Sequence, residues 1–202
     1  MNFYLATSNR HKADELERLL AERGLERVSV RTAADAGGMP WVDEDSNTFE
    51  GNARLKARAF KQRAGDRAWV LADDSGLEVD ALGGAPGVYS ARYAGAEATD
   101  AENNARLLGA LEGKPVCDRS ARFRCCLVLI APDGTEESFE GVCEGRIAME
   151  PSGKHGFGYD PVFVPAGYAR SFGELGESVK SRISHRARAL EKLGARLAEI
   201  GD

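Results

Sequence analysis

The sequence lacks long apolar runs and an excess of basic residues. No stretch reaches the roughly 18 consecutive apolar residues of a membrane-spanning helix, and no basic segment precedes a long apolar one at the N-terminus. We therefore expect a cytoplasmic protein. The 202 residues carry 27 Lys and Arg against 32 Asp and Glu, a net charge of -5. This balance disfavours a nucleic-acid-binding protein, because such proteins need a basic surface to displace counterions.

Cysteine motifs, repeats and linkers are also missing. The four cysteines form no CxxC pair, which gives no support to a zinc or redox motif. Cys125 and Cys126 are adjacent and would point to opposite faces of a strand. All four are expected to be reduced thiols in or near the core. Without an internal repeat, a low-complexity tract or a long linker, residues 1–202 are expected to form a single domain.

Strand and helix patterns alternate along the chain, which predicts an α/β class with a mixed sheet. The expected strands cover residues 3–6, 28–31, 69–72, 123–130, 135–144 and 162–164. A first helix carries Ala13, Leu16, Leu19 and Leu20 on one face and stops at Gly24. Further helices are expected after an Asn47 cap, over 99–111, and at the C-terminus with the stripe Leu190, Leu193, Leu197 and Ile200.

Two adjacent carboxylates, Asp73 and Asp74, follow the apolar strand 69–72, where we expect that strand to end abruptly. Two ionised carboxylates side by side at the end of an apolar strand cost free energy unless a positive charge lies beside them. Mg²⁺ fits, because it prefers oxygen ligands, takes one or two carboxylates, and completes its shell with water and phosphates. The alternative is an acidic turn that caps the next element.

Small polar and basic residues fill the turn before the first helix: Thr7, Ser8, Asn9, Arg10, His11 and Lys12. Backbone N–H groups at a helix N-terminus suit an anion such as phosphate, and Lys12 adds a movable positive charge. The segment is not the GxxxxGK[ST] phosphate loop. A solvated helix start is the alternative interpretation.

Basic residues also gather at the start of the last helix, where Ser184 is the expected N-cap. His185 and Arg186 then lie in the first turn, and Lys180 lies in the loop before it. Cations usually complement helix C-termini, so this cluster indicates an anionic or hydrogen-bond-accepting partner. A solvated basic surface is the alternative.

An aromatic residue, Phe157, lies between two glycines in the loop Gly156-Phe157-Gly158-Tyr159-Asp160. The glycines allow close approach of a ligand, and an exposed Phe157 would offer a stacking surface for a base. The alternative is a core aromatic at a tight turn. The four clusters together supply metal carboxylates, phosphate-binding cations and a stacking aromatic, as a nucleoside triphosphate hydrolase requires.

In their order along the chain, these motifs resemble the inosine/xanthosine triphosphate pyrophosphatase family over nearly the whole length. The resemblance rests on segments 6–9, 48–57, 72–77, 82–93, 157–161 and 183–186, with Lys12, Glu44 and Lys180. It implies an elongated mixed sheet flanked by helices, with two lobes and an active-site cleft between them, and a homodimer. It also implies Mg²⁺-dependent hydrolysis of dITP, ITP, XTP and dXTP to the monophosphate and pyrophosphate. Ser8 replaces a glycine common in the family, and Val179 and Ser181 flank Lys180 in place of a more polar pair.

The resemblance implies roles for individual residues. Asp74 is expected to be the general base and a magnesium ligand, with Glu44 and Asp73 completing the acidic set. Thr7, Asn9, Lys12 and Lys56 are expected to hold the triphosphate, with Ser75 beside them. Further substrate-binding residues are expected to be Ser8, Arg10 and His11. Phe157 is expected to stack on the purine, and the remaining residues near the base are Gly158, Tyr159, Asp160, Lys180, His185 and Arg186.

Three other functions compete with this interpretation. A pyrophosphatase for modified pyrimidine or methylated nucleotides shares the opening segment, but Phe157 and Ser184-His185-Arg186 favour the purine branch. A non-catalytic nucleotide sensor would need the phosphate-binding cations and not the acidic set. A nucleic-acid-binding module is disfavoured by the acidic charge balance.

Overall fold

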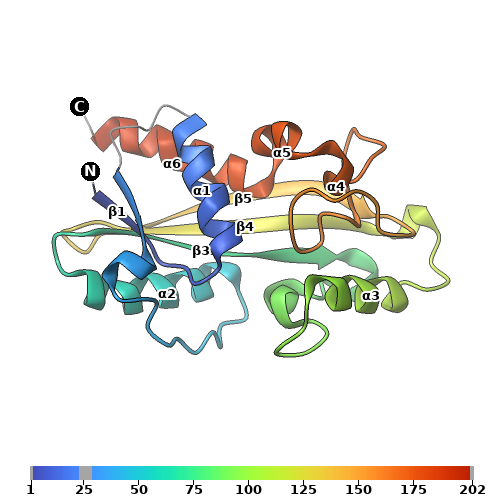
Figure 1. The fold of residues 1–202 in the computed structure, drawn as a ribbon, viewed down its shortest axis with the longest axis horizontal. Helices are drawn as coiled ribbons and strands as arrows, with labels where there is room; N and C mark the ends of the chain where they lie inside the picture. The colour runs from blue at the N-terminus through green and yellow to red at the C-terminus, as the bar shows by residue number, and fades with distance from the viewer. Residues whose placement is uncertain (1, 23–28, 201–202) are drawn as a thin grey trace. The chain divides into compact units, whose positions relative to one another are not determined.

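The computed structural model describes residues 2–22 and 29–200, which form one sheet with helices along it (Figure 1). The strands are β1 (Asn2–Leu5), β2 (Ser29–Thr32), β3 (Trp69–Val79), β4 (Ser120–Ile130), β5 (Glu136–Ile147) and β6 (Phe163–Pro165). The α-helices are α1 (Arg10–Glu22), α2 (Phe49–Ala64), α3 (Asp100–Ala110), α4 (Phe172–Leu175), α5 (Glu177–Ile183) and α6 (His185–Ile200). Short 3₁₀ helices are η1 (Ala33–Ala36), η2 (Asp80–Leu82), η3 (Gly87–Arg92) and η4 (Val116–Asp118).

The sheet is mixed and has the strand order β2-β1-β3-β4-β5-β6. β1 runs parallel to both β2 and β3, whereas β5 and β6 pair in antiparallel register. The register sets Phe3 opposite Trp69, and their rings stack with centroids 5.5 Å apart. The predicted α/β class with a mixed sheet flanked by helices is confirmed.

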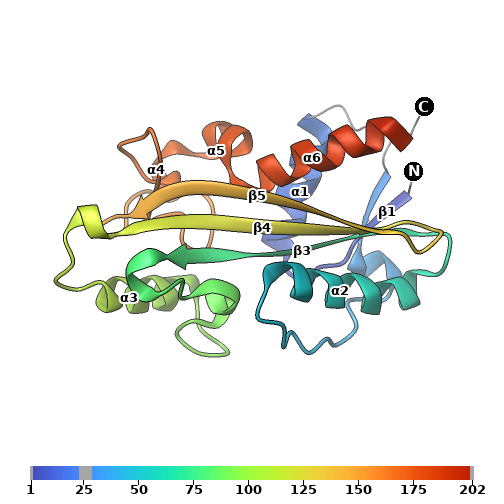
Figure 2. The ribbon, with the colours of Figure 1, turned by 180° about the vertical axis from the view of Figure 1, so that it is seen from behind.

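The chain divides into two compact units, and β3, β4 and β5 contribute residues to both. The described residues of the first unit are 2–22, 29–74, 125–141 and 188–200. In this unit, α1 and α6 lie on one side of the strands and α2 on the opposite side (Figures 1 and 2). The second unit comprises Ser75–Arg124 and Val142–Ala187. In this unit, α3 lies on one side of the strands, and α4 and α5 lie on the other.

Each unit buries the apolar residues that its elements present at their characteristic spacing. The stripe predicted on α1 is buried, and its Leu16 and Leu19 are almost fully covered. In the second unit, the rings of Phe123 and Phe163 pack with centroids 4.6 Å apart, and those of Phe163 and Phe172 stack at 5.6 Å. Aromatic contacts of this kind add to the free energy gained from the buried apolar area alone.

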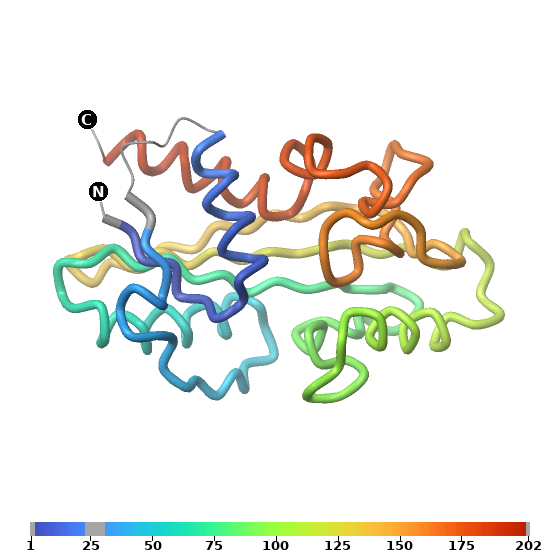
Figure 3. The backbone as a smooth tube through the Cα atoms, in the orientation of Figure 1, coloured from blue at the N-terminus to red at the C-terminus, as the bar shows by residue number. Residues whose placement is uncertain are grey.

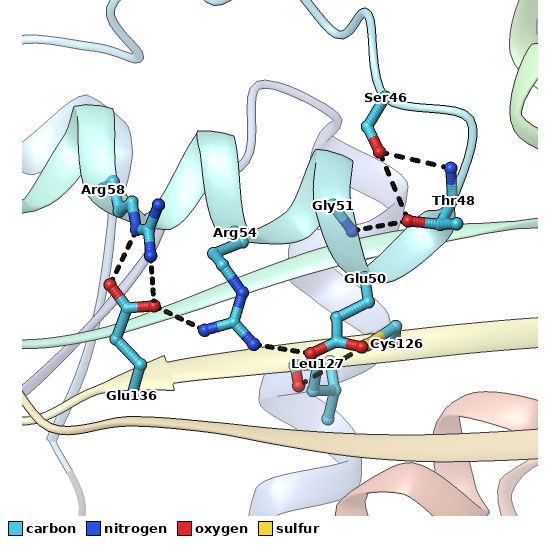
Figure 4. Close-up of polar contacts among 9 residues, drawn as sticks. All are labelled: Ser46, Thr48, Glu50, Gly51, Arg54, Arg58, Cys126, Leu127 and Glu136. Atoms are coloured by element: carbon cyan, nitrogen blue, oxygen red, sulfur yellow. Dashed lines mark hydrogen bonds and ion pairs between the residues drawn. The ribbon is translucent and has the colours of Figure 1, made fainter.

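The helix α2 is held on β5 by two arginines (Figure 4). Arg58 donates to both oxygens of Glu136, over 2.8 and 3.0 Å, and Arg54 binds the same carboxylate. The N-cap of α2 is Thr48, whose hydroxyl oxygen accepts from the Gly51 N–H at 3.0 Å. The prediction of Asn47 as the cap was therefore wrong by one residue. Bidentate pairing fixes the orientation of α2 on the sheet.

β3 does not end where the sequence pattern placed its end. It continues through Asp73 and Asp74 to Val79, because lysine side chains pair with these carboxylates and offset the cost of burying them. Lys180, expected in a loop, lies in α5, and the short helix α4 was also missed.

The four cysteines lie in different environments. All four cysteines are free thiols, but Cys117 is exposed and does not belong to the core. Burial raises the pKa of the Cys126 thiol to about 12, which keeps it protonated.

Ile200 is only half-buried at the end of the α6 stripe. Gly24 and Val28 lie outside the described residues. Within residues 2–22 and 29–200, no helix is long and apolar enough to cross a membrane.

Candidate active site

Two lysines and three carboxylates form a cluster in the first unit, in which Lys56, Asp73 and Asp74 are buried. The Lys12 ammonium lies 2.7 Å from Asp73 Oδ1, and the Lys56 ammonium lies 2.6 Å from Asp74 Oδ1 and 3.1 Å from Glu44 Oε2. Helices α1 and α2 supply the lysines, and β3 supplies both aspartates. Glu44 comes from the segment between η1 and α2, which Figure 3 shows as an open loop. These five residues are called the lysine–carboxylate cluster below.

The cluster carries three potential negative charges against two positive ones, and this excess affects its pKa values. Burial raises the pKa of Asp74, although Lys56 and Lys12 oppose that effect. Burial alone would lower the pKa of Lys56, but the charges of Asp74 and Glu44 outweigh it, and that pKa lies above its ordinary value. Both shifts favour the protonated form of the group concerned.

One oxygen of Asp74 is left for a further partner. Asp74 Oδ2 is buried and has no hydrogen-bond partner among the described residues. A buried carboxylate oxygen without a partner is uncommon in a folded protein, because its desolvation is not compensated. No three His, Cys, Asp or Glu side chains are placed to hold a metal ion in the described part of the chain. The lysines, and not a completed acidic set, are the immediate neighbours of the carboxylates.

The predicted phosphate segment forms the N-terminus of α1. Asn9 caps this helix, because its Oδ1 accepts from the Lys12 N–H at 3.1 Å. The Asn9 N–H in turn donates to Thr7 Oγ1, also at 3.1 Å. Asn9 and its neighbours Ser8, Arg10 and His11 are exposed. The first turn of α1 therefore presents an electropositive helix end next to Lys12.

Two further residues of the first unit support the cluster. Asn52 is 1% exposed, and its Oδ1 accepts from the Ser46 N–H at 3.0 Å, which holds the loop of Glu44 on α2. The Cys125 thiol lies 3.1 Å from Asp73 Oδ2. Asn52 was visible in the sequence as the residue one turn before Lys56. The sequence did not predict a role for Cys125, because its contact with Asp73 joins residues of two different strands.

A second cluster lies in the second unit around Phe157. Asp160 Oδ2 accepts from the Phe157 N–H at 2.9 Å and from Lys180 Nζ at 2.7 Å. The side chains of Asp160 and Lys180 are 2% and 3% exposed, so this ion pair is almost fully buried. A buried pair with these additional hydrogen bonds fixes the conformation of the loop that carries Phe157.

Two cations lie over the Phe157 ring. Lys180 Nζ is 4.6 Å and Arg186 Cζ is 5.4 Å from the ring centroid, within the range of cation–π attraction. Arg186 Nη2 also donates to Ser75 Oγ at 2.6 Å. Lys180 of α5 and Arg186 of α6 therefore contact an aromatic ring of the protein itself, and Arg186 also contacts a hydroxyl group.

The remaining predicted residues of this cluster contribute mainly to its framework. The His185 ring stacks on Phe123 with centroids 4.8 Å apart and an interplanar angle of 14°. The Tyr159 hydroxyl donates to the Ser90 carbonyl at 2.8 Å, and burial raises the pKa of this phenol, which keeps it neutral. Both side chains are buried and orient the segments that carry Arg186 and Phe157.

Lysines beside carboxylates on an α/β sheet suit an enzyme that acts on phosphate groups, and the Phe157 ring in the second unit suits stacking on a base. The chain belongs to the Ham1 family, whose family model matches residues 3–196. A relative from Opitutus terrae named dITP/XTP pyrophosphatase is 50% identical and covers 100% of this chain and 98% of its own length. Another dITP/XTP pyrophosphatase, from Desulforamulus reducens, is 50% identical over 95% of this chain and 93% of its own.

A solved structure supports the same assignment. The structure of a HAM1 protein from Coxiella burnetii matches with a TM-score of 0.87 at 41% sequence identity. The match covers 98% of this chain and 99% of that chain. The family predicted from the motifs is therefore confirmed.

The charge balance of the cluster leads to a stability prediction. Replacing Lys56 with methionine should lower the free energy of unfolding by about 3 kcal/mol, because buried Asp74 loses its nearest counter-charge. Adding Asp74→Asn to this variant should recover much of the loss, since a neutral amide needs no counter-charge. Urea denaturation followed by circular dichroism measures both values.

A matched control is Lys192→Met on α6, where the lysine is exposed. This change should alter the free energy of unfolding by less than about 0.5 kcal/mol. Equal losses in Lys56→Met and in the double variant would show that charge compensation does not hold this cluster together.

Proposed function

We propose that the protein hydrolyses non-standard purine nucleoside triphosphates, namely dITP, ITP, dXTP and XTP. The products are the nucleoside monophosphate and pyrophosphate, so these nucleotides are removed from the nucleotide pool. The observation that carries the proposal is the direct pairing of Lys12 and Lys56 with Asp73, Asp74 and Glu44. Two relatives named dITP/XTP pyrophosphatase, each 50% identical to this chain, support this reaction.

The triphosphate binds to groups of the first unit. Lys12 and Lys56 exchange their carboxylate partners for phosphate oxygens, which are strong acceptors for charged donors. The N-terminus of α1, with Thr7 and Asn9, adds backbone N–H groups and a favourable dipole. Phosphoryl transfer depends mainly on positioning and on neutralising charge, so these groups provide much of the stabilisation.

Glu44, Asp73 and Asp74 are the residues that would hold Mg²⁺. The fit rests on the excess negative charge of the cluster and on the buried Asp74 Oδ2, which has no partner among the described residues. Their oxygen chemistry also suits this ion. When bound, Mg²⁺ neutralises charge on the polyphosphate. Movement of the two lysines to the phosphates would leave the carboxylates to the metal.

Asp74 is the general base of the proposed reaction. Its Oδ2 accepts a proton from the attacking water, and the rise in its pKa on burial makes it a stronger proton acceptor than an exposed aspartate. Before substrate binds, Lys56 holds the other oxygen of the carboxylate at 2.6 Å and so orients the group. The bond that breaks joins the α- and β-phosphates, because the products are the monophosphate and pyrophosphate.

The base binds to groups of the second unit. Phe157 stacks on the purine, and the Asp160–Lys180 pair holds its loop. A 6-oxo purine needs a hydrogen-bond donor where adenine presents an amino group, and Arg186, His185 or backbone N–H groups can provide it. Adenine leaves such a donor unsatisfied, which is a strong basis for rejection. We further propose that the enzyme is a cytoplasmic homodimer, and a monomer mass in light scattering would contradict the dimer.

Asp74→Asn tests the role of the base. The amide preserves an acceptor for Lys56 but cannot take up a proton, so kcat should fall by about 10²–10⁴-fold. The circular dichroism spectrum should remain unchanged. Asp66→Asn is the control, because Asp66 is an exposed aspartate in the turn after α2, and its kcat should match that of the parent. Near-full activity of Asp74→Asn would remove Asp74 from this role.

A substrate panel tests the reaction class and the metal. ITP, XTP, GTP, ATP and CTP are incubated with and without Mg²⁺, and the products are followed by phosphorus NMR. We expect pyrophosphate from ITP and XTP, little from the others, and almost no turnover after EDTA treatment. Release of orthophosphate would overturn the proposed reaction, and full turnover in EDTA would overturn the metal requirement.

A further inference from the structure

The helix α3 binds the loop of Phe157 through one residue, Gly158. The Gly158 N–H donates to Asp100 Oδ2 at 2.6 Å, and the Gly158 carbonyl accepts from Asn104 Nδ2 at 2.9 Å. Asp100 and Asn104 are four residues apart and therefore lie on the same side of α3. Both backbone polar groups of one loop residue are thus bound by adjacent turns of one helix.

These contacts complete the support of the Phe157 backbone. The Phe157 N–H is held by Asp160, and the next residue is held by α3. Gly158 has φ of +61°, and Gly156 has φ of +74°, so both lie in the left-handed region that favours glycine. A Cβ at Gly156 would also collide with the Asp160 carboxylate. The loop conformation therefore depends on specific partners on both sides of Phe157.

Asn104 is a polar residue at a buried position. It is 6% exposed, and its Oδ1 is buried without a hydrogen-bond partner among the described residues. A half-satisfied buried amide costs stability compared with an apolar residue of similar size. The amide therefore indicates that its donor, which binds Gly158, is needed.

We infer that Asp100 and Asn104 are positioning residues for base recognition: they hold Gly158 so that the Phe157 ring is fixed in place to stack on a purine. This inference rests on the proposed function. The hydrogen bonds that Asp100 and Asn104 make to Gly158 lie within the second unit, whereas the proposed phosphate-binding lysines belong to the first. Loss of these hydrogen bonds should weaken binding of the base and leave binding of the phosphates intact, because a freed loop must first be ordered before Phe157 can stack.

The test compares Asn104→Ala and Asp100→Ala with the parent in Mg²⁺ buffer. The measurements are kcat and KM for ITP, and Kd for IMP and for pyrophosphate by calorimetry. We expect KM for ITP and Kd for IMP to rise about 5- to 30-fold, part of the full effect of base stacking. The values of kcat and of Kd for pyrophosphate should stay within about threefold.

Two variants separate positioning from general damage. Asp100→Asn retains an oxygen that accepts from Gly158, so it should restore binding of IMP. Asn103→Ala removes a neighbouring buried amide whose bonds go to Ala91 and Ala94, and it should leave Kd for IMP unchanged. Asp100 is exposed, so Asp100→Ala tests the same loop even if Asn104→Ala fails to fold.

Phe157→Ala distinguishes failure of the inference from failure of the proposed function. If Phe157→Ala weakens IMP while Asp100→Ala and Asn104→Ala do not, the positioning role is overturned and the proposed function stands. An equal loss in Asn103→Ala would also overturn it, because the effect would then be unspecific. If Phe157→Ala leaves IMP binding unchanged, the proposed base site fails, and the positioning role fails with it.

Discussion

Charge compensation between Lys12, Lys56 and the three carboxylates is the interaction on which the proposed site depends. Each aspartate is buried at a cost that a nearby cation offsets, and Lys56 is buried at a similar cost. The compensation is incomplete, since three acids face two lysines. Burial raises the pKa of Asp74 against the opposing charges of Lys56 and Lys12, and the charges of Asp74 and Glu44 raise that of Lys56. The proposed magnesium site rests on this remaining negative charge, and the proposed phosphate site rests on the two lysines.

The second unit uses the same principle for a different purpose. The buried Asp160–Lys180 pair fixes a loop, and Lys180 also contributes positive charge above the Phe157 ring. Arg186 divides its interactions between that ring and Ser75, the residue that follows Asp74 in the chain. In both units, therefore, a buried ion pair orders the groups that are proposed to bind substrate. Such pairs are better explained by positioning than by their net contribution to stability.

Several features followed from the sequence through local physics. The α1 stripe, the helix α3 and the strands β4 and β5 each depend on spacing and on residues close together in the chain. Two predictions from the sequence, the end of β3 and the N-cap of α2, were wrong for physical reasons. The sequence pattern predicted that β3 ends after Ala72, because Asp73 and Asp74 disfavour a buried strand. Lysines from distant segments pair with both aspartates, and the strand continues to Val79. Asn47 and Thr48 are both good caps, and only the backbone path selects Thr48.

The sequence by itself determined the element types, the chemical inventory and the family, because motif order and periodicity are properties of the chain. Tertiary structure alone decided which charges meet: Lys12 with Asp73, Lys56 with Asp74 and Glu44, and Lys180 with Asp160. It also decided that Asp100 and Asn104 bind Gly158 across more than 50 residues of sequence. The reason is that contacts between distant segments depend on strand order and helix placement. The spacing of residues within one segment does not predict either.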